Sequence, residues 1–215
     1  ALGTARDALD LLTLSQDRCG ACLTGFELMS DICLQLVATH FPELPKPFPR
    51  SHGQYVLMEL SSCESGGHAA SMLEQAVGVA LDRGIGRDAV IAASGAQSHG
   101  LWQLREHISM AQAKAGKNIK HDISLPISRI SRFLAATDAQ LQQAFPGCVL
   151  VTFGHLGDGN LHYNVAPPEG VAHDDFLEHQ DAINRIVHDQ VDAFGGSISA
   201  EHGIGALKRD ELSRY

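Results

Sequence analysis

One stretch of the sequence, CVLVTFGHLGDGNLHYNVAPP at residues 148–168, predicts a β-hairpin. Both arms read as strands, and Asp158-Gly159 between them is the dipeptide preferred in a two-residue type I′ turn. Counting outward from that turn pairs His155 with His162 across the two strands, with Cβ atoms about 4.5–5.5 Å apart. Two imidazoles at that separation can bind one cation, so the hairpin predicts part of a metal site.

Further polar side chains lie on and after the second strand of this hairpin. Because strand side chains alternate, Asn160, His162 and Asn164 share one face, which is unusual in a core unless that face lines a site. In the segment SISAEHGIG, Glu201 and His202 follow a short strand-like run and precede two glycines. Glu201 would complete a His/His/Glu metal set with open positions for substrate, leaving His202 to act as a base. The alternative interpretation is structural, with these residues as turn and capping groups.

A third group of polar residues lies upstream, in LWQLREHIS and KHDISLP. Arg105 and Ser109 are i and i+4 neighbours on a predicted helix, and Lys120 lies on the strand predicted next. An arginine and a lysine with a hydroxyl between them can bind a carboxylate, the arginine through two hydrogen bonds and the lysine as a point charge. Alternatively, Arg105 only pairs with Glu106 or Asp122 at the surface.

The rest of the chain alternates between helical and strand-like patterns, which predicts an α+β fold. Residues 5–16 read as a short helix or a connecting segment, and a proline-rich loop is predicted over 41–53. Helices are predicted at 26–41, 68–84, 98–116, 127–145, 173–196 and 206–215, and strands at 54–62, 87–94, 119–126, 148–155, 160–168 and 197–199. We expect duplicated ferredoxin-like units, with an antiparallel sheet covered by helices, and halves at 22–95 and 96–215.

Composition excludes several classes of protein. The chain has 215 residues and a formal net charge of −9, which would repel phosphate backbones, so no nucleic acid is expected as a partner. No apolar stretch is long enough to span a bilayer, and the N-terminus lacks the pattern of a signal peptide. The 5 cysteines are an odd number in a chain too long to need disulfide staples, which favours a reducing compartment. We therefore expect a cytoplasmic protein, or one of the mitochondrial matrix in a eukaryote.

Together these motifs resemble the C-terminal domain of FAD-linked oxidases in the vanillyl-alcohol-oxidase superfamily. GHLGDGNLHYNV and SISAEHGIG are typical of the wider family, whereas LWQLRE with KHDISLP is typical of its D-2-hydroxyglutarate dehydrogenase-like branch. The resemblance covers most of the chain, from Phe26 onward. It implies that residues 1–215 form an α+β cap domain, built as a duplicated ferredoxin-like fold over the flavin of an N-terminal FAD-binding domain. That domain is absent from this sequence, so we expect the chain to be a fragment of a longer flavoprotein.

The resemblance also implies a role for each candidate residue. Three residues would be ligands of a divalent metal, commonly zinc: His155, His162 and Glu201. Four would bind the substrate, three of them its carboxylate: Arg105, Ser109, Lys120 and, as a further substrate contact, Asn164. His202 would be the catalytic base. Ser109 is a mild departure, because the family often has threonine at that position.

From the resemblance we expect the full-length protein to oxidise a D-2-hydroxy acid, one like D-2-hydroxyglutarate, to its 2-oxo acid by hydride transfer to FAD. The fragment alone is expected to be inactive. One alternative is a D-lactate or glycolate dehydrogenase, and another is a non-catalytic metal-binding module. The expected partners are a small 2-hydroxy acid, the FAD-binding domain of the same protein and a second copy in a homodimer.

Overall fold

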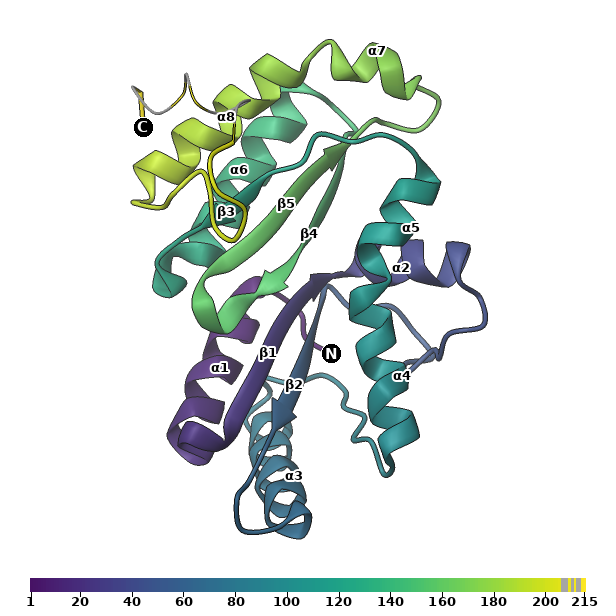
Figure 1. Cartoon of the computed structure of the whole chain (residues 1–215), viewed down its shortest axis with the longest axis vertical. Coiled ribbons are helices and arrows are strands. Elements are labelled where there is room, and N and C mark those ends of the chain that lie inside the picture. The colour runs from purple at the N-terminus through teal and green to yellow at the C-terminus, as the bar shows by residue number, and fades with distance from the viewer. Residues whose placement is uncertain (206–208, 210, 212–213) are drawn as a thin grey trace. The chain divides into compact units, whose positions relative to one another are not determined.

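The computed structural model describes residues 1–205, 209, 211 and 214–215, in two compact units. Unit 1 is Ala1–Ala111 and unit 2 is Gln112–Tyr215. Each unit combines antiparallel strands with helices (Figure 1), which confirms the α+β class. The duplicated ferredoxin-like units and the halves at 22–95 and 96–215 stay predictions. The helix predicted over 206–215 falls largely outside the described residues.

Unit 1 is built on a pair of antiparallel strands, β1 (Leu23–Ser30) and β2 (Gln54–Leu60). Its helices are α1 (Ala5–Cys19), the 3-10 turn η1 (Gly20–Cys22), α2 (Asp31–His40), α3 (Gly66–Asp82) and α4 (Gly95–Glu106). The chain passes into unit 2 within α5 (Ile108–Ala115). No helix among the described residues is both long and apolar enough to cross a membrane.

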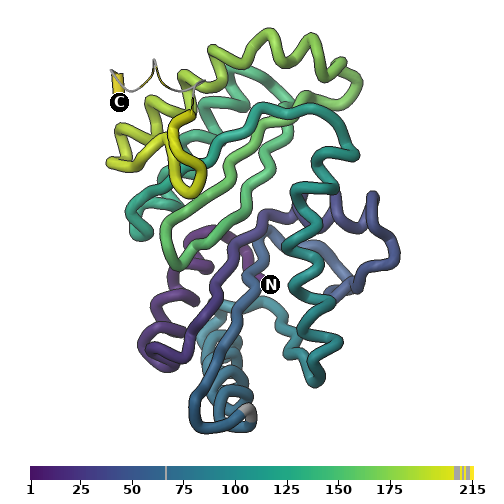
Figure 2. Tube along the Cα trace, in the orientation of Figure 1, coloured from purple at the N-terminus to yellow at the C-terminus, as the bar shows by residue number. Residues whose placement is uncertain are grey.

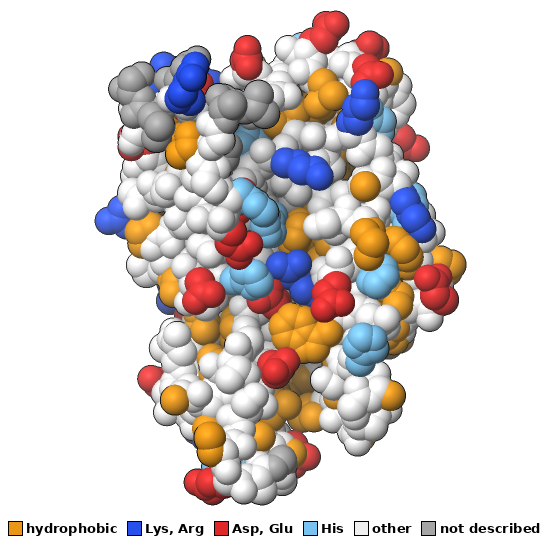
Figure 3. Space-filling model, in the orientation of Figure 1, with side chains coloured by type: hydrophobic (Ala, Val, Ile, Leu, Met, Phe, Trp, Pro, Cys, Tyr) orange, Lys and Arg blue, Asp and Glu red, His pale blue; other side chains and the backbone are white. Residues whose placement is uncertain are grey.

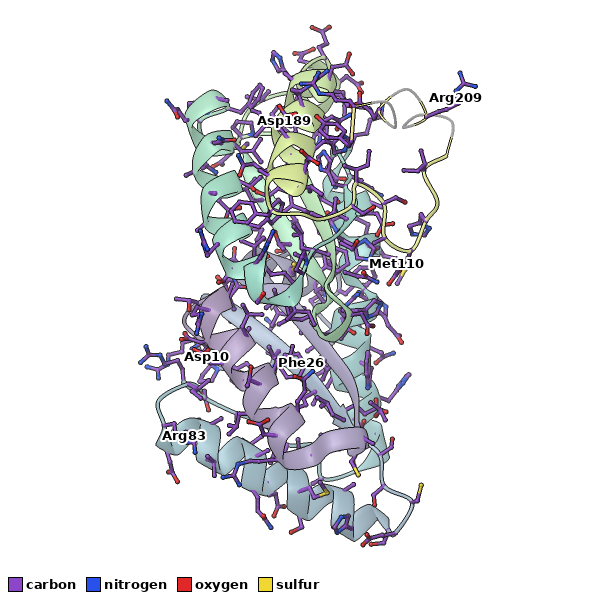
Figure 4. All side chains as sticks on the ribbon, turned by 90° about the vertical axis from the view of Figure 1, so that its left-hand side faces the viewer. Asp10, Phe26, Arg83, Met110, Asp189 and Arg209 are labelled. Carbon is purple, nitrogen blue, oxygen red and sulfur yellow. The ribbon has the colours of Figure 1, made fainter. Side chains whose placement is uncertain are left out.

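The two faces of the β1–β2 pair are covered by different helices. On one face Phe26 pairs with Met58, and the sulfur of Met58 accepts a hydrogen bond of 3.2 Å from Ser15 Oγ of α1. Figure 4 shows Phe26 beside that helix. On the other face Glu59 Oε2 accepts a 2.7 Å hydrogen bond from Trp102 Nε1 of α4. Carboxylates on this face therefore meet donors from α4.

Two predicted elements of unit 1 differ from the observed ones, and a third, which the sequence left open, is a helix. The helix predicted at 26–41 is wrong over its first residues, which belong to β1, because those residues pair with β2; the helix itself starts at Asp31. Residues 87–94, all of them described, contain no strand. The ambiguous N-terminal segment is helical because Thr4 and Asp7 form a capping box: the Asp7 N–H donates to Thr4 Oγ1 and the Thr4 N–H to Asp7 Oδ2.

The helix predicted at 98–116 is interrupted. His107 ends α4, and α5 begins at the next residue, Ile108. The backbone N–H of His107 donates to the Gln103 carbonyl oxygen, and its Nδ1 lies 2.8 Å from the same oxygen. Its ring packs edge-on against Phe41 at 4.7 Å between centroids. The side chain is therefore fixed locally at the point where the helix changes course.

Unit 2 has a three-stranded antiparallel arrangement with β5 (Asn160–Ala166) between β4 (Val149–His155) and β3 (Asp122–Ser124). Figure 2 follows the chain from β4 through the turn into β5. The helices are α6 (Ile130–Ala144), α7 (His173–Leu177) and α8 (Gln180–Ala193), with 3-10 turns η2 (Ile127–Arg129) and η3 (Leu156–Asp158). The helix predicted at 173–196 is thus two helices, and the strand predicted at 197–199 is a single bridge, Ser197 to Ser124.

The alternation of β5 separates a core face from a polar face. Tyr163 is fully buried, and its ring packs against Phe133 of α6 with 5.7 Å between centroids. On β3, Ile123 is likewise fully buried and pairs with Leu161. The residues between these positions, His162 among them, point to the opposite face. The polar face predicted from the sequence is therefore the face turned away from the core of this unit.

The buried pair Tyr163–Asp138 predicts a measurable effect on stability. Tyr163 Oη donates a 2.6 Å hydrogen bond to Asp138 Oδ1. We expect Tyr163→Phe to lower the free energy of unfolding by about 1.5–3 kcal/mol, because the buried carboxylate loses its donor. Burial raises the pKa of Asp138 above its ordinary 3.8, against the lowering effect of the Tyr163 hydrogen bond. The contribution of Asp138 to the free energy of unfolding is therefore fully present below pH 3.8 and is lost as the pH rises through the raised pKa.

Asp138→Asn provides the matched variant for that prediction, since the amide keeps an acceptor for Tyr163 but cannot ionise. Urea denaturation at about pH 4 and about pH 7 should show a smaller pH dependence in Asp138→Asn than in the wild type. An equal pH dependence in the two proteins would contradict the assignment.

Candidate functional site

The hairpin carries His155 and His162, but not in the predicted register. His162 pairs with Phe153, and their rings lie 4.8 Å apart between centroids. The turn is longer than two residues, because Asp158 belongs to η3 and only Gly159 adopts a positive φ, of 77°. The direct pairing of the two histidines is therefore wrong. The shift is by two residues, which leaves each side chain on its predicted face.

Gly159 fixes this turn by close approach to the segment that follows β3. A Cβ atom at Gly159 would lie 2.3 Å from the carbonyl oxygen of Leu125. The backbone N–H of Leu125 in turn donates to the carbonyl oxygen of Gly159 at 2.9 Å. Only a glycine combines the left-handed conformation with this contact.

Asn164 lies on the polar face but is buried. It pairs with Val151, whereas the predicted register, with His155 opposite His162, would place it opposite Phe153. Its Nδ2 donates to Gln112 Oε1 at 3.0 Å, and its Oδ1 accepts from the backbone N–H of His121 at 3.3 Å. Gln112 is a residue that sequence reasoning missed. The sequence signal that could have identified Gln112 was its position directly after the last buried apolar residue of the helix.

The segment after α8 brings Glu201 to His155. Glu201 Oε1 lies 3.0 Å from His155 Nε2, and both side chains are a little over one-third exposed. The backbone N–H groups of Glu201 and His202 donate to Asp122 Oδ2 at 3.1 and 2.9 Å. The imidazole of His202 is exposed and makes no hydrogen bond to a described residue. Two of the three predicted metal ligands are thus in contact, and the predicted base lies beside one of them in sequence.

Asp122 also faces the third predicted metal ligand. It lies directly opposite His162 in the β3–β5 ladder, and its Oδ1 is 3.8 Å from His162 Nδ1. That oxygen is buried and has no hydrogen-bond partner among the described residues. Figure 3 shows histidine side chains against acidic ones over the strands of unit 2. The sequence suggests Asp122 only as an alternative surface partner of Arg105 and does not assign it to the site.

These residues can be tested against the divalent metal that the sequence predicts. Imidazole nitrogens and carboxylate oxygens are the donors that zinc takes, and the orphaned Asp122 oxygen is a buried acceptor next to them. Among the described residues, however, no group of three His, Cys, Asp or Glu side chains lies close enough together to hold a metal ion. The donors fit in kind, but they form two pairs and not one converged set.

The predicted carboxylate-binding residues divide between the units. In unit 1, Arg105 Nε donates a 2.8 Å hydrogen bond to Glu27 Oε2, and the two side chains are 12% and 4% exposed. The partner is thus a buried glutamate on β1, which the sequence did not suggest. Ser109 is exposed on α5, so the break at His107 separates it from the helix that carries Arg105.

Lys120 belongs to unit 2 and lies two residues before β3. His121, which follows it, and Ile123 on β3 are buried. Lys120 is exposed and makes no hydrogen bond or ion pair with a described residue. Its ammonium group is therefore available to a ligand.

Unit 1 also contains an apolar hollow that the sequence did not predict. It measures about 730 Å³ and is lined by β2, α3, α4 and the segment before α4. None of the candidate site residues lines it. The volume of a hollow does not by itself identify a functional site.

The chain has an α+β fold and a polar strand face that carries histidines and carboxylates. Comparison with known protein families identifies the class of protein to which this combination belongs. The chain matches the family of FAD linked oxidases, C-terminal domain, over residues 1–215, and it belongs to that family. This confirms the resemblance that the motifs indicate.

Several relatives of this chain within the family carry the same name. A D-2-hydroxyglutarate dehydrogenase of Xanthomonas citri pv. viticola is 39% identical over 190 residues, which are 88% of this chain and 39% of that protein. One from Stutzerimonas stutzeri is 36% identical over 192 residues, 88% of this chain and 40% of that protein. The mitochondrial D-2-hydroxyglutarate dehydrogenase of Rattus norvegicus is 34% identical over 206 residues, 96% of this chain and 37% of that protein. The chain thus spans about two fifths of the length of these relatives.

Proposed function

We propose that this chain is the substrate- and metal-binding cap domain of an FAD-dependent dehydrogenase that oxidises a D-2-hydroxy acid to the 2-oxo acid. D-2-hydroxyglutarate is the proposed substrate, supported by family membership and by the names of the relatives. The observation that carries the proposal is the pairing of Glu201 with His155 beside the unengaged imidazole of His202. This arrangement offers metal donors and a base on adjacent residues.

Each residue of the proposed site has a chemical role. His155, His162 and Glu201 would hold a divalent metal, zinc first, which when bound acts as a Lewis acid on the substrate hydroxyl. His202 would accept the proton of that hydroxyl, and the flavin of the FAD-binding domain would supply the acceptor for the hydride of the α-carbon. The substrate carboxylates and their surroundings are bound by the remaining set: Arg105, Ser109, Lys120 and Asn164.

The proposal extends to partners and location. The partners are a small 2-hydroxy acid and the FAD-binding domain of the same protein, and we also propose a homodimer. We also propose a cytoplasmic location, or the mitochondrial matrix in a eukaryote; the mitochondrial names of two eukaryotic relatives support a mitochondrial location for the eukaryotic case alone.

Flavin reduction in the full-length protein tests this function. With D-2-hydroxyglutarate, D-lactate and glycolate supplied in turn, and L-2-hydroxyglutarate as the stereochemical control, the flavin should bleach fastest with D-2-hydroxyglutarate. Lys120→Met should raise the KM for this diacid by about tenfold or more, because it removes an ammonium group that we propose binds a substrate carboxylate. Lys120 is exposed and unpaired among the described residues, so its loss should cost little structurally. The KM for D-lactate should change less. Lys117→Met removes an exposed lysine from the same segment and serves as the control.

The other outcomes discriminate between the alternatives. Faster bleaching with D-lactate or glycolate would replace the proposed substrate with a shorter one. A protein that binds zinc but whose flavin none of these acids reduces would be a metal-binding module.

A further inference from the structure

The geometry points to Asp122 as the positioning residue of this site, an inference that rests on the proposed function. One of its carboxylate oxygens fixes the backbone of Glu201 and His202. The other orients the imidazole of His162. A single side chain on β3 would thus set the positions of two metal ligands and of the base.

The first half of the inference concerns the segment after α8. The amides of Glu201 and His202 are exposed loop groups that both donate to the same oxygen, Asp122 Oδ2, at 3.1 and 2.9 Å. Backbone donors to a carboxylate form charge-assisted hydrogen bonds, which are about twice as strong as neutral ones. With its backbone held there, the Glu201 side chain reaches His155 Nε2 at 3.0 Å. Asp122 therefore anchors Glu201 and His202 to β3, beyond the backbone bridge that Ser124 and Ser197 make earlier in the same segment.

The second half concerns His162. A histidine that binds a metal usually donates its other ring N–H to a carboxylate, which fixes both the tautomer and the ring orientation. Asp122 Oδ1 lies 3.8 Å from His162 Nδ1, longer than a hydrogen bond, in the strand position directly opposite. The nearby carboxylate oxygen would favour the tautomer that carries its proton on Nδ1. Nε2 is then the unprotonated nitrogen and the one that can bind a Lewis acid.

The orphaned oxygen distinguishes this role from simple capping. Asp122 Oδ1 is buried and has no hydrogen-bond partner among the described residues, while Oδ2 has two donors. A buried acceptor without a donor costs free energy, and such groups are rare in native proteins. A residue that only capped the loop would need a single acceptor oxygen. The second oxygen is explained by His162.

Two substitutions separate the two halves. Asp122→Asn keeps one acceptor oxygen for the two loop amides but places an NH₂ group against His162. The NH₂ group favours the tautomer with the proton on Nε2, so the imidazole loses its metal-binding nitrogen. Asp122→Ala removes both functions. Asp175→Asn, on an exposed residue of α7 in the same unit, controls for the loss of one negative charge.

The measurements are zinc affinity, by competition with a chromophoric chelator, and hydrogen exchange of the peptide covering residues 199–205, both in the full-length flavoprotein. We expect Asp122→Asn to weaken zinc binding by about 10–100-fold with near-normal exchange. Asp122→Ala should also increase the exchange rate of the Glu201 and His202 amides by about tenfold or more. Asp175→Asn should match the wild type in both measurements.

Several outcomes would overturn the inference. Wild-type zinc affinity in Asp122→Asn would remove the His162 half, and unchanged exchange in Asp122→Ala would remove the loop half. If the wild-type protein binds no zinc and its flavin is reduced by no 2-hydroxy acid, the proposed function fails and the His162 half with it. Exchange in Asp122→Ala still decides the loop half in that case, so the two failures are distinguishable.

Discussion

Replacing His202 with asparagine in the full-length flavoprotein is expected to lower turnover of a D-2-hydroxy acid by at least about 10²-fold, the scale for loss of a general base. Asparagine cannot take up the substrate proton. The surroundings of His202 favour this role, because its backbone N–H is held by Asp122 while its exposed ring makes no hydrogen bond to a described residue. The measurement is steady-state kcat at equal flavin and metal content.

A second histidine provides the control for this experiment. His99 is exposed on α4 and has no assigned role, so His99→Asn should keep wild-type turnover. Near-normal turnover in His202→Asn would contradict the assignment of the base. Lost turnover together with lost zinc would instead make His202 a metal ligand.

The second large effect is expected at the buried pair of Glu27 and Arg105. Glu27→Gln should lower the free energy of unfolding by about 3–5 kcal/mol, the usual cost of removing one partner from a buried ion pair. The Glu27 side chain is only 4% exposed and Arg105 12%, so solvent offers little compensation to the guanidinium. The substitution keeps the shape of the side chain and removes its charge. Urea denaturation of the full-length protein measures the change.

Glu106 is the natural control, because it is the acidic neighbour of Arg105 on α4 and is exposed. Glu106→Gln should change stability by less than about 0.5 kcal/mol, as exposed charges usually do. Equal small effects of Glu27→Gln and Glu106→Gln would show that the buried pair does not stabilise unit 1.

The hairpin shows how far sequence patterns reach. Strand alternation correctly predicts both arms and the polar face, since a period of two is a property of the strand itself. The register depends on which turn residues adopt positive φ, and Asp158-Gly159 allows more than one solution. The choice depends on the approach of Gly159 to Leu125, a contact with another part of the chain.

The helix predicted at 26–41 failed for a related reason. Phe26, Met29 and Ile32 have helical spacing, but a short apolar run is ambiguous between strand and helix. Pairing with β2 decides the matter, and no local pattern contains that information.

The site residues that were missed depend on distant partners. Asp122 holds amides that lie 79 and 80 positions later, and Glu27 meets an arginine 78 positions later. An acidic residue in a strand has no local signature for such a contact. The motif residues could be proposed as candidates because glycines and histidines cluster around them, whereas the carboxylates that contact them or their neighbours have no such local pattern.

Gly159 has a consequence for how this hairpin can vary between homologues. Any side chain there must displace the Leu125 carbonyl, which a Cβ would approach to 2.3 Å, and so must part the turn from the end of β3. Gly170 also has a positive φ, of 81°, but an added Cβ would meet nothing within 4 Å. Substitutions such as asparagine, which tolerates that conformation, can accumulate at Gly170. In evolutionary terms the hairpin has one permissive end, near Gly170, and one restricted end, at Gly159, and the restricted end is the one nearest the candidate residues His155 and His162.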